Sequence, residues 1–260
     1  MTIEDLPPKM EEYFREGFVL VENVLTAGQV EAMRTALAAA IAAQDRTWGD
    51  NPYYIDAGMV HNPMVHDPVF LEIFSNDRIN GFLEAALDEH CILYACTSSS
   101  MPPHGTNYSG RIHVDCPRVI PGYPTNIGFL IAFDDFTREN GATYFLPRSF
   151  ERTDPPDDAE FFDNAARPLP RAGDAILFNA RTWHMGGQNK TDRYRHAFTM
   201  NVCRSYMRQR FDYPRLLGEG LLETLDERAL KRLGYRVRVP VDLDEYYVPP
   251  EQRLYLGGQG

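Results

Sequence analysis

The centre of the chain, about residues 91–204, consists of short apolar runs separated by turn residues, and this pattern limits the fold most narrowly. The runs lie at 126–133, 143–146, 175–178 and 195–203. Two stretches between these runs have the composition of tight turns, namely Asn140-Gly141 and residues 171–174. Many short strands broken by turns favour a β-sandwich or barrel over an alternating α/β fold. We therefore expect a mainly β protein with flanking helices.

The residues before this region, about 1–90, predict helices. A helical stretch around residues 10–15 is stopped by Gly17, and a β-prone run follows at 18–24. Thr26 and Gln29 have the spacing of a capping box, which marks a helix start. One apolar stripe along that helix is made of Val30, Met33, Leu37 and Ile41. The stripe predicts a helix that covers a sheet.

The length of 260 residues suits a single domain. We expect it to comprise the helical N-terminal part, a β core over about 91–204, and an extension over about 205–260. The extension contains a helical segment from Asp226 to Leu233, ended by Gly234.

Charge and composition exclude several classes of partner. The net charge is -11, from 37 acidic and 26 basic residues, which argues against nucleic acid or an anionic membrane. No run approaches the roughly 18 apolar residues of a membrane span, and the first residues do not resemble a signal peptide. The four cysteines have no Cys-x-x-Cys spacing. We expect a cytoplasmic protein that acts on a small-molecule substrate.

The stretch His113-Val-Asp115 is the strongest chemical signal. In a strand the side chains of residues i and i+2 point to the same face, so His113 and Asp115 can reach one metal ion. A third ligand can come from His184, which follows the run 175–178. Two histidines and one carboxylate form the facial triad of non-haem Fe(II) oxygenases, which leaves three adjacent coordination positions open. These three residues are the predicted metal ligands and catalytic residues.

A cosubstrate site is indicated by the arginines that follow His184. The far carboxylate of 2-oxoglutarate requires a bidentate cationic partner, which arginine provides. Arg195 lies eleven residues after His184, at the start of the last apolar run. Arg193 has the same expected facing and is the alternative.

The order of several short motifs then resembles the phytanoyl-CoA dioxygenase family of Fe(II)/2-oxoglutarate-dependent oxygenases. The resemblance runs from about residue 16 to 205. Its pieces are His113-Val-Asp115, residues 140–143 with 146–147, Gly173-Asp174, Trp183-His184, and residues 187–191 leading to Arg195. The order and spacing together are far more specific than any single piece.

The resemblance implies a double-stranded β-helix, or jelly roll, with iron bound near one open end by His113, Asp115 and His184. It also implies that Arg195 binds the C5 carboxylate of 2-oxoglutarate, that Thr97 on the first core strand helps to hold this cosubstrate, and that O₂ is consumed. The chain departs from the family pattern at residues 147–150, where relatives often have Pro-Gly-Ser-His, and at Gly186, where some have serine.

The reaction that we expect is hydroxylation of an aliphatic C–H bond in a small metabolite, with release of succinate and CO₂, in specialised biosynthesis. Asp115 supports oxygenation, because related halogenases lack this carboxylate. The same cofactors also support desaturation, cyclisation or endoperoxidation. Alternatives of other classes are a non-catalytic metal-binding jelly roll and a zinc hydrolase. Candidate pocket-wall residues are Tyr108, Arg118, Asn179 and Trp183. The remaining histidines are interpreted as packing or surface residues.

Overall fold

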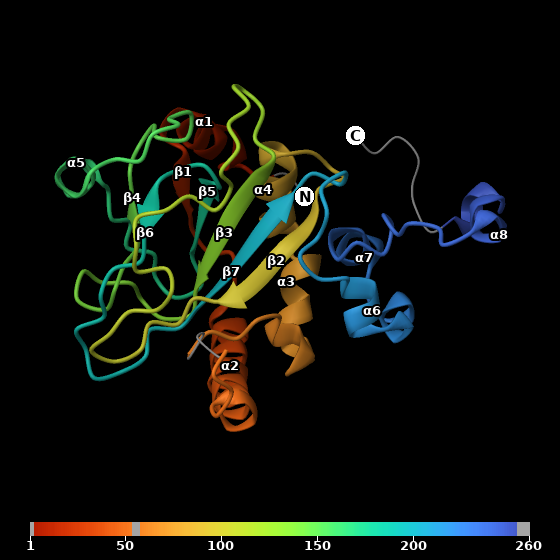
Figure 1. Ribbon diagram of the computed structural model, residues 1–260, viewed down its shortest axis with the longest axis horizontal. Helices are drawn as coiled ribbons and strands as arrows, with labels where there is room; N and C mark the ends of the chain where they lie inside the picture. The colour runs from red at the N-terminus through yellow and green to blue at the C-terminus, as the bar shows by residue number, and fades with distance from the viewer. Residues whose placement is uncertain (1–2, 54–57, 254–260) are drawn as a thin grey trace.

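The structure is a computed structural model that describes residues 3–53 and 58–253 (Figure 1). Its largest element is a five-stranded antiparallel sheet in the order β1-β5-β3-β7-β2. A second, two-stranded sheet pairs β4 with β6. The strands are β1 Phe18–Val21, β2 Ile92–Ser98, β3 Asn126–Ala132, β4 Tyr144–Phe145, β5 Ala175–Asn179, β6 His184–Met185 and β7 Ala197–Cys203.

Helices precede, flank and follow these strands. They are α1 Leu6–Glu16, α2 Ala27–Trp48, α3 Glu72–Ser75, α4 Asp77–Ala86, α5 Asp158–Asn164, α6 Tyr213–Leu217, α7 Glu227–Arg232 and α8 Leu243–Tyr246, with 3-10 turns at 63–65, 68–71, 219–223 and 250–252. In Figure 1 the pair β4 and β6 stands to the left of the large sheet, and α6, α7 and α8 extend to the right. Within the described ranges, no helix combines the length and the apolar character needed to cross a bilayer.

The large sheet has two different faces, because successive side chains alternate across it. On β3, Phe129 and Ile131 join the main core, which also contains Met33 and Leu37 of α2. Leu130, from the opposite face, packs in a second apolar cluster that includes Phe145 of the small sheet. One face is thus closed by helices, and the other turns toward the small sheet.

The predicted N-terminal elements are confirmed. Thr26 caps α2 in a full capping box with Gln29, and the four residues of the predicted stripe are all buried in the main core. Helix α1 ends at Gly17, where φ is +86° and a Cβ would lie 2.6 Å from the Thr182 hydroxyl. The glycine therefore allows both the turn and the close approach of the β5–β6 connection.

The tight turn at Asn140-Gly141 lies in the connection between the two sheets. It does not join two paired neighbours in one sheet, because β3 belongs to the large sheet and β4 pairs with β6. The loop that carries the turn crosses from one sheet to the other, and the Asn140 side chain accepts from the backbone N–H of Thr137 at 2.7 Å. Gly141 adopts a φ of +88°.

The C-terminal extension is anchored to the helical layer. Its predicted helix is confirmed as α7. Arg232 is 1% exposed and donates to Glu84 of α4 at 2.9 Å and to the Asn80 side chain at 2.8 Å. A buried, fully paired arginine of this kind fixes the extension against α4.

Candidate metal centre

The segment that carries His113 and Asp115 is extended, but it is not part of a regular strand. His113 forms an isolated antiparallel bridge with His184 of β6: each backbone N–H donates to the other residue's carbonyl, at 3.0 and 2.9 Å. The N–H of Asp115 donates to the Ala180 carbonyl at 2.9 Å. The expected strand is therefore reduced to a single bridge. The extended backbone still directs residues i and i+2 to the same side.

The three predicted ligands converge. The Asp115 Oδ1 atom lies 3.6 Å from Nε2 of His113 and 3.8 Å from Nε2 of His184. One donor atom from each residue lies within 4.8 Å of the other two, and the two imidazole centroids are 4.2 Å apart. Donors bound at about 2.1 Å in adjacent positions of one ion lie about 3 Å apart, so a small contraction suffices to form a site.

Both imidazoles are oriented for metal binding. The Nδ1 atom of His113 is 2.7 Å from the Arg111 carbonyl, and that of His184 is 2.8 Å from the Thr182 carbonyl. A carbonyl only accepts, so each Nδ1 carries the hydrogen and each Nε2 offers a lone pair toward Asp115. Phe145 stacks on His184 with a centroid distance of 5.7 Å, and the Phe178 ring packs against it at a tilt, 5.0 Å away.

The local electrostatics favour an ionised Asp115 and a neutral His184. Burial lowers the pKa of His184 to about 4. Burial alone would raise the pKa of Asp115, but its interactions with the neighbouring side chains of His113 and His184 outweigh burial and lower that pKa. At neutral pH the Asp115 carboxylate is therefore ionised and His184 is neutral, which are the forms that bind a metal ion.

The triad opens into a cavity of about 360 Å³ between the two sheets. Thr97 and Tyr108 lie in its wall, as the sequence predicts. The hydroxyl of Thr97 donates to the Val60 carbonyl at 3.0 Å, and the Tyr108 side chain lies mostly in solvent. The apolar part of the wall is formed by Met59, Ala95, Cys96, Leu130, Phe145 and Phe178.

Arg195 is buried on the cavity face of the large sheet. It shares this face with Thr199 and Asn201 of β7, which line the cavity. Its guanidinium lies 4.0 Å above the Phe136 ring, and Nη2 donates to the Gly141 carbonyl at 3.4 Å. Nε and Nη1 have no hydrogen-bond partner, and no carboxylate of residues 3–53 or 58–253 forms an ion pair with Arg195. Burial lowers its pKa to about 9.

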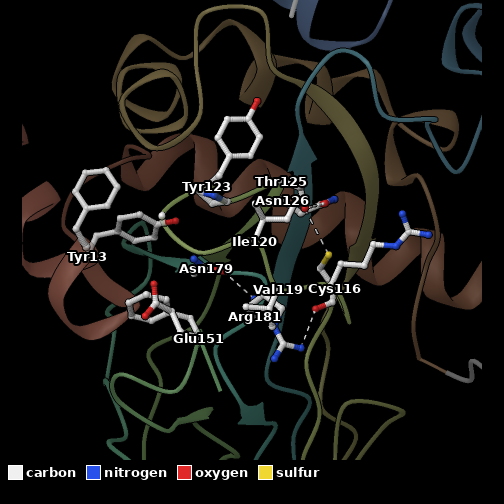
Figure 2. A pocket seen from close by; sticks show the side chains of 15 residues that line it. Tyr13, Cys116, Val119, Ile120, Tyr123, Thr125, Asn126, Glu151, Asn179 and Arg181 are labelled. Atoms are coloured by element: carbon white, nitrogen blue, oxygen red, sulfur yellow. Dashed lines mark hydrogen bonds between the residues drawn. The ribbon is translucent and has the colours of Figure 1, made fainter. Parts of the chain in front are cut away.

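Other sequence-based assignments need correction. Arg193 is exposed, because it lies in the turn before β7, where strand alternation does not apply. Arg118 and Asn179 line a second cavity, also of about 360 Å³, shown in Figure 2. Asn179 comes from the helix-facing side of β5, which explains its placement. Trp183 packs with Leu146 and Phe161 in a small apolar cluster and does not line the triad cavity.

Sequence reasoning missed several residues of the triad cavity. His61, interpreted as a packing or surface residue, lines the cavity and forms a β-bridge with Thr97. Asn201 also lines it, and its side chain contributes to the lowered pKa of the Asp115 carboxyl. Alternation from Arg195 along β7 could have identified Asn201, since the two residues are an even number apart. No sequence signal points to His61, which approaches from a loop between helices.

Comparison with known proteins agrees with this site. The family model of phytanoyl-CoA dioxygenase matches residues 13–197, which include all three triad residues and Arg195. The chain belongs to the phytanoyl-CoA dioxygenase family. A family relative from Mycobacterium tuberculosis, the uncharacterised protein Rv1501, is 33% identical over 254 residues and is covered to 92%, with 94% of this chain aligned. Dioxygenase sphC of Aspergillus fumigatus is 24% identical, covering 89% of this chain and 69% of its own.

Solved structures of similar fold include two non-haem enzymes. The α-ketoglutarate-dependent epimerase SnoN from nogalamycin biosynthesis superposes with a TM-score of 0.57 and 21% identity, over 78% of this chain and 82% of SnoN. The non-haem monooxygenase ThoJ gives a TM-score of 0.62 at 19% identity, over 75% of this chain and 77% of ThoJ. Family membership and the dioxygenase relatives together identify this phytanoyl-CoA dioxygenase family member as a non-haem iron oxygenase.

Proposed function

We propose that the protein is an Fe(II)/2-oxoglutarate-dependent dioxygenase that hydroxylates an aliphatic C–H bond of a small metabolite. The main evidence for 2-oxoglutarate as the cosubstrate is the buried side chain of Arg195. A buried cation without a carboxylate partner is costly, and it persists where a ligand compensates it. Its unpartnered Nε and Nη1 atoms match the two oxygens of a carboxylate, which arginine binds in a bidentate manner.

The residues of the site divide into two groups. His113, Asp115 and His184 would hold the iron, which would bind 2-oxoglutarate and react with O₂. Arg195 would hold the distal carboxylate of the cosubstrate, with Thr97 in the wall nearby. Bound iron supplies the oxidation of the substrate, coupled to decarboxylation of 2-oxoglutarate to succinate and CO₂. The protein orients both molecules and keeps the site apolar around His184.

The fold assignment that supports this proposal is the double-stranded β-helix. The two antiparallel sheets face each other, and the triad lies between them on a bridge and on β6. We infer that they are the two halves of one jelly-roll domain.

The nature of the cavity suggests the substrate class. Its wall combines aromatic and aliphatic side chains with a few hydroxyls and amides, and its volume of about 360 Å³ suits a small organic molecule. Among the described residues of its wall, Arg210 is the one arginine or lysine, which does not form a basic track for a phosphate backbone. A role in specialised metabolism is also consistent with SnoN, which is an enzyme from nogalamycin biosynthesis.

The deciding experiment has two steps. Anaerobic addition of Fe(II) and then 2-oxoglutarate should produce the weak visible charge-transfer band of the chelate. Incubation with O₂ and a panel of small metabolites should then release succinate, with a product heavier by one oxygen in the mass spectrum. A product lighter by two hydrogens would indicate desaturation or cyclisation instead. Absence of the band, or turnover with Zn(II) and no need for O₂, would refute the proposal.

A further inference from the structure

The Asp115 carboxylate has a neutral partner besides the two histidines. The side chain of Asn201, on the cavity face of β7, lines the same cavity as this carboxylate and, as a neighbouring hydrogen-bond donor, contributes to the lowered pKa of Asp115. A carboxylate only accepts hydrogen bonds, so the Asn201 amide must present its Nδ2 hydrogens to Asp115. Its Oδ1 atom therefore has to face away from the triad.

A second asparagine fixes the Asn201 amide in this orientation. Asn126, on the neighbouring strand β3, donates from Nδ2 to Oδ1 of Asn201 at 2.9 Å. Asn126 pairs with Cys203 and Gly128 pairs with Asn201 in the β3–β7 register, so the two asparagines are diagonal neighbours on one face. Asn126 is itself oriented by Thr125, whose hydroxyl donates to Oδ1 of Asn126 at 3.0 Å.

The chain of hydrogen bonds returns to the metal-binding segment. The Sγ atom of Cys116 lies 3.5 Å from the Thr125 hydroxyl oxygen. Since that hydroxyl donates to Asn126, the thiol is the donor in this contact. Figure 2 shows the contact as a dashed line between Cys116 and Thr125, at the wall of the second cavity. Every hydrogen bond thus points in one direction, from Cys116 through Thr125, Asn126 and Asn201 to Asp115.

We propose that Asn201, Asn126 and Thr125 are positioning residues that orient the metal-binding carboxylate of Asp115. The inference rests on the proposed metal site. Hydrogen bonds to a ligating carboxylate set the direction of its oxygens and its basicity, and aligned donors polarise one another. The set of hydrogen bonds that runs from Cys116 to Asp115, here called the relay, is partly sheltered: Asn126 is 5% and Cys116 8% exposed, and Thr125 and Asn201 are half-buried. Since Cys116 follows Asp115 directly, the same set of bonds fixes both the backbone and the side chain of this ligand.

The test is the affinity of the purified protein for Mn(II), measured by electron paramagnetic resonance without cosubstrate or turnover. Asn201→Ala should weaken Mn(II) binding by about 10- to 100-fold, the usual effect of removing a partner of a metal ligand. Asn126→Ala should produce a smaller loss, and the isosteric Thr125→Val the smallest. The double variant Asn126→Ala/Asn201→Ala should bind no more weakly than Asn201→Ala alone, because Asn126 acts only through Asn201.

Met200→Leu is the matched control. It changes the adjacent position of β7 on the helix-packed face, with little change in volume, and its Mn(II) affinity should equal that of the wild type. Thermal unfolding verifies that each variant is folded, and Thr125→Val decides the question if the alanine variants are not. Affinities unchanged in the folded variants, or additive losses in the double variant, would overturn the relay and leave the metal site standing. A wild type that binds no metal would overturn both.

Discussion

Replacing Arg195 with methionine should weaken cosubstrate binding without destabilising the unliganded protein. The guanidinium is 1% exposed, and two of its nitrogens have no partner. Because its pKa falls to about 9, burial disfavours the charged form by roughly 5 kcal/mol at about 1.4 kcal/mol per pH unit. An apolar side chain of similar length avoids this cost. The free energy of unfolding should therefore rise, on the order of 1–3 kcal/mol.

The effect on 2-oxoglutarate binding has the opposite sign. Removing one partner of a buried, hydrogen-bonded charge pair costs about 2–5 kcal/mol. Since about 1.4 kcal/mol corresponds to a tenfold change in a dissociation constant, the Kd for 2-oxoglutarate should rise by roughly 30- to 4000-fold. If Arg195 served only to pack the core, its replacement would not produce a more stable protein that binds 2-oxoglutarate much more weakly.

The assay combines calorimetric titration of 2-oxoglutarate into the Mn(II)-loaded protein with thermal unfolding of the metal-free form. Arg193→Met is the control, since this arginine is exposed in the preceding turn, and neither measurement should change. If Arg195→Met binds 2-oxoglutarate within about threefold of the wild type, the assignment of Arg195 to the distal carboxylate is wrong. Loss of binding in Arg193→Met instead would transfer that role to Arg193.

Three further predictions concern the metal centre and its support. His184→Ala should abolish Mn(II) binding in calorimetry while the protein remains folded, and retained stoichiometric binding would exclude this residue as a ligand. Burial favours the neutral ring of His113, but the neighbouring Asp115 outweighs burial and raises the pKa of His113. Because only the neutral ring binds a metal ion, Mn(II) affinity should be constant above that pKa and fall about tenfold per pH unit below it. An Mn(II) affinity that does not change between pH 8 and pH 5 would contradict this prediction. Gly128→Ala would place a Cβ 2.0 Å from the ring of Phe178, which packs on His184. This variant should therefore lose about 1–3 kcal/mol of stability and bind Mn(II) more weakly. Gly220→Ala is the control, because its Cβ would meet no atom within 4 Å, and denaturation and Mn(II) titration should show no change in stability or affinity.

Local signals predict much of this structure because they act over a few residues. The capping box at Thr26 and the stop at Gly17 depend only on neighbouring backbone, and both appear as expected. His113 and Asp115 are two residues apart, so any extended backbone brings them to one side. Their convergence with His184 follows from the bridge between the two histidines.

Other features depend on which segments meet in space, and a single sequence does not contain that information. Arg193 and Arg195 differ in burial because regular pairing of β7 begins only at Ala197, with one bridge at Arg195 before it. Trp183 faces a separate cluster because the connection after β5 turns its side chain toward Leu146. The relay from Thr125 to Asp115 requires the exact neighbours of β3 in the sheet, which no motif specifies.

The bridge between His113 and His184 has a consequence for how such a protein can diversify. Two reciprocal backbone hydrogen bonds tie the imidazole-bearing segments together, while the long loop before His113, at 99–112, contains no regular strand and contributes Ser99, Tyr108 and Ser109 to the wall of the triad cavity. Insertions or substitutions in this loop can reshape the wall of the reaction chamber and leave the spacing of the metal donors intact. The same metal-binding core can therefore be reused for unrelated molecules, with selectivity determined by this loop.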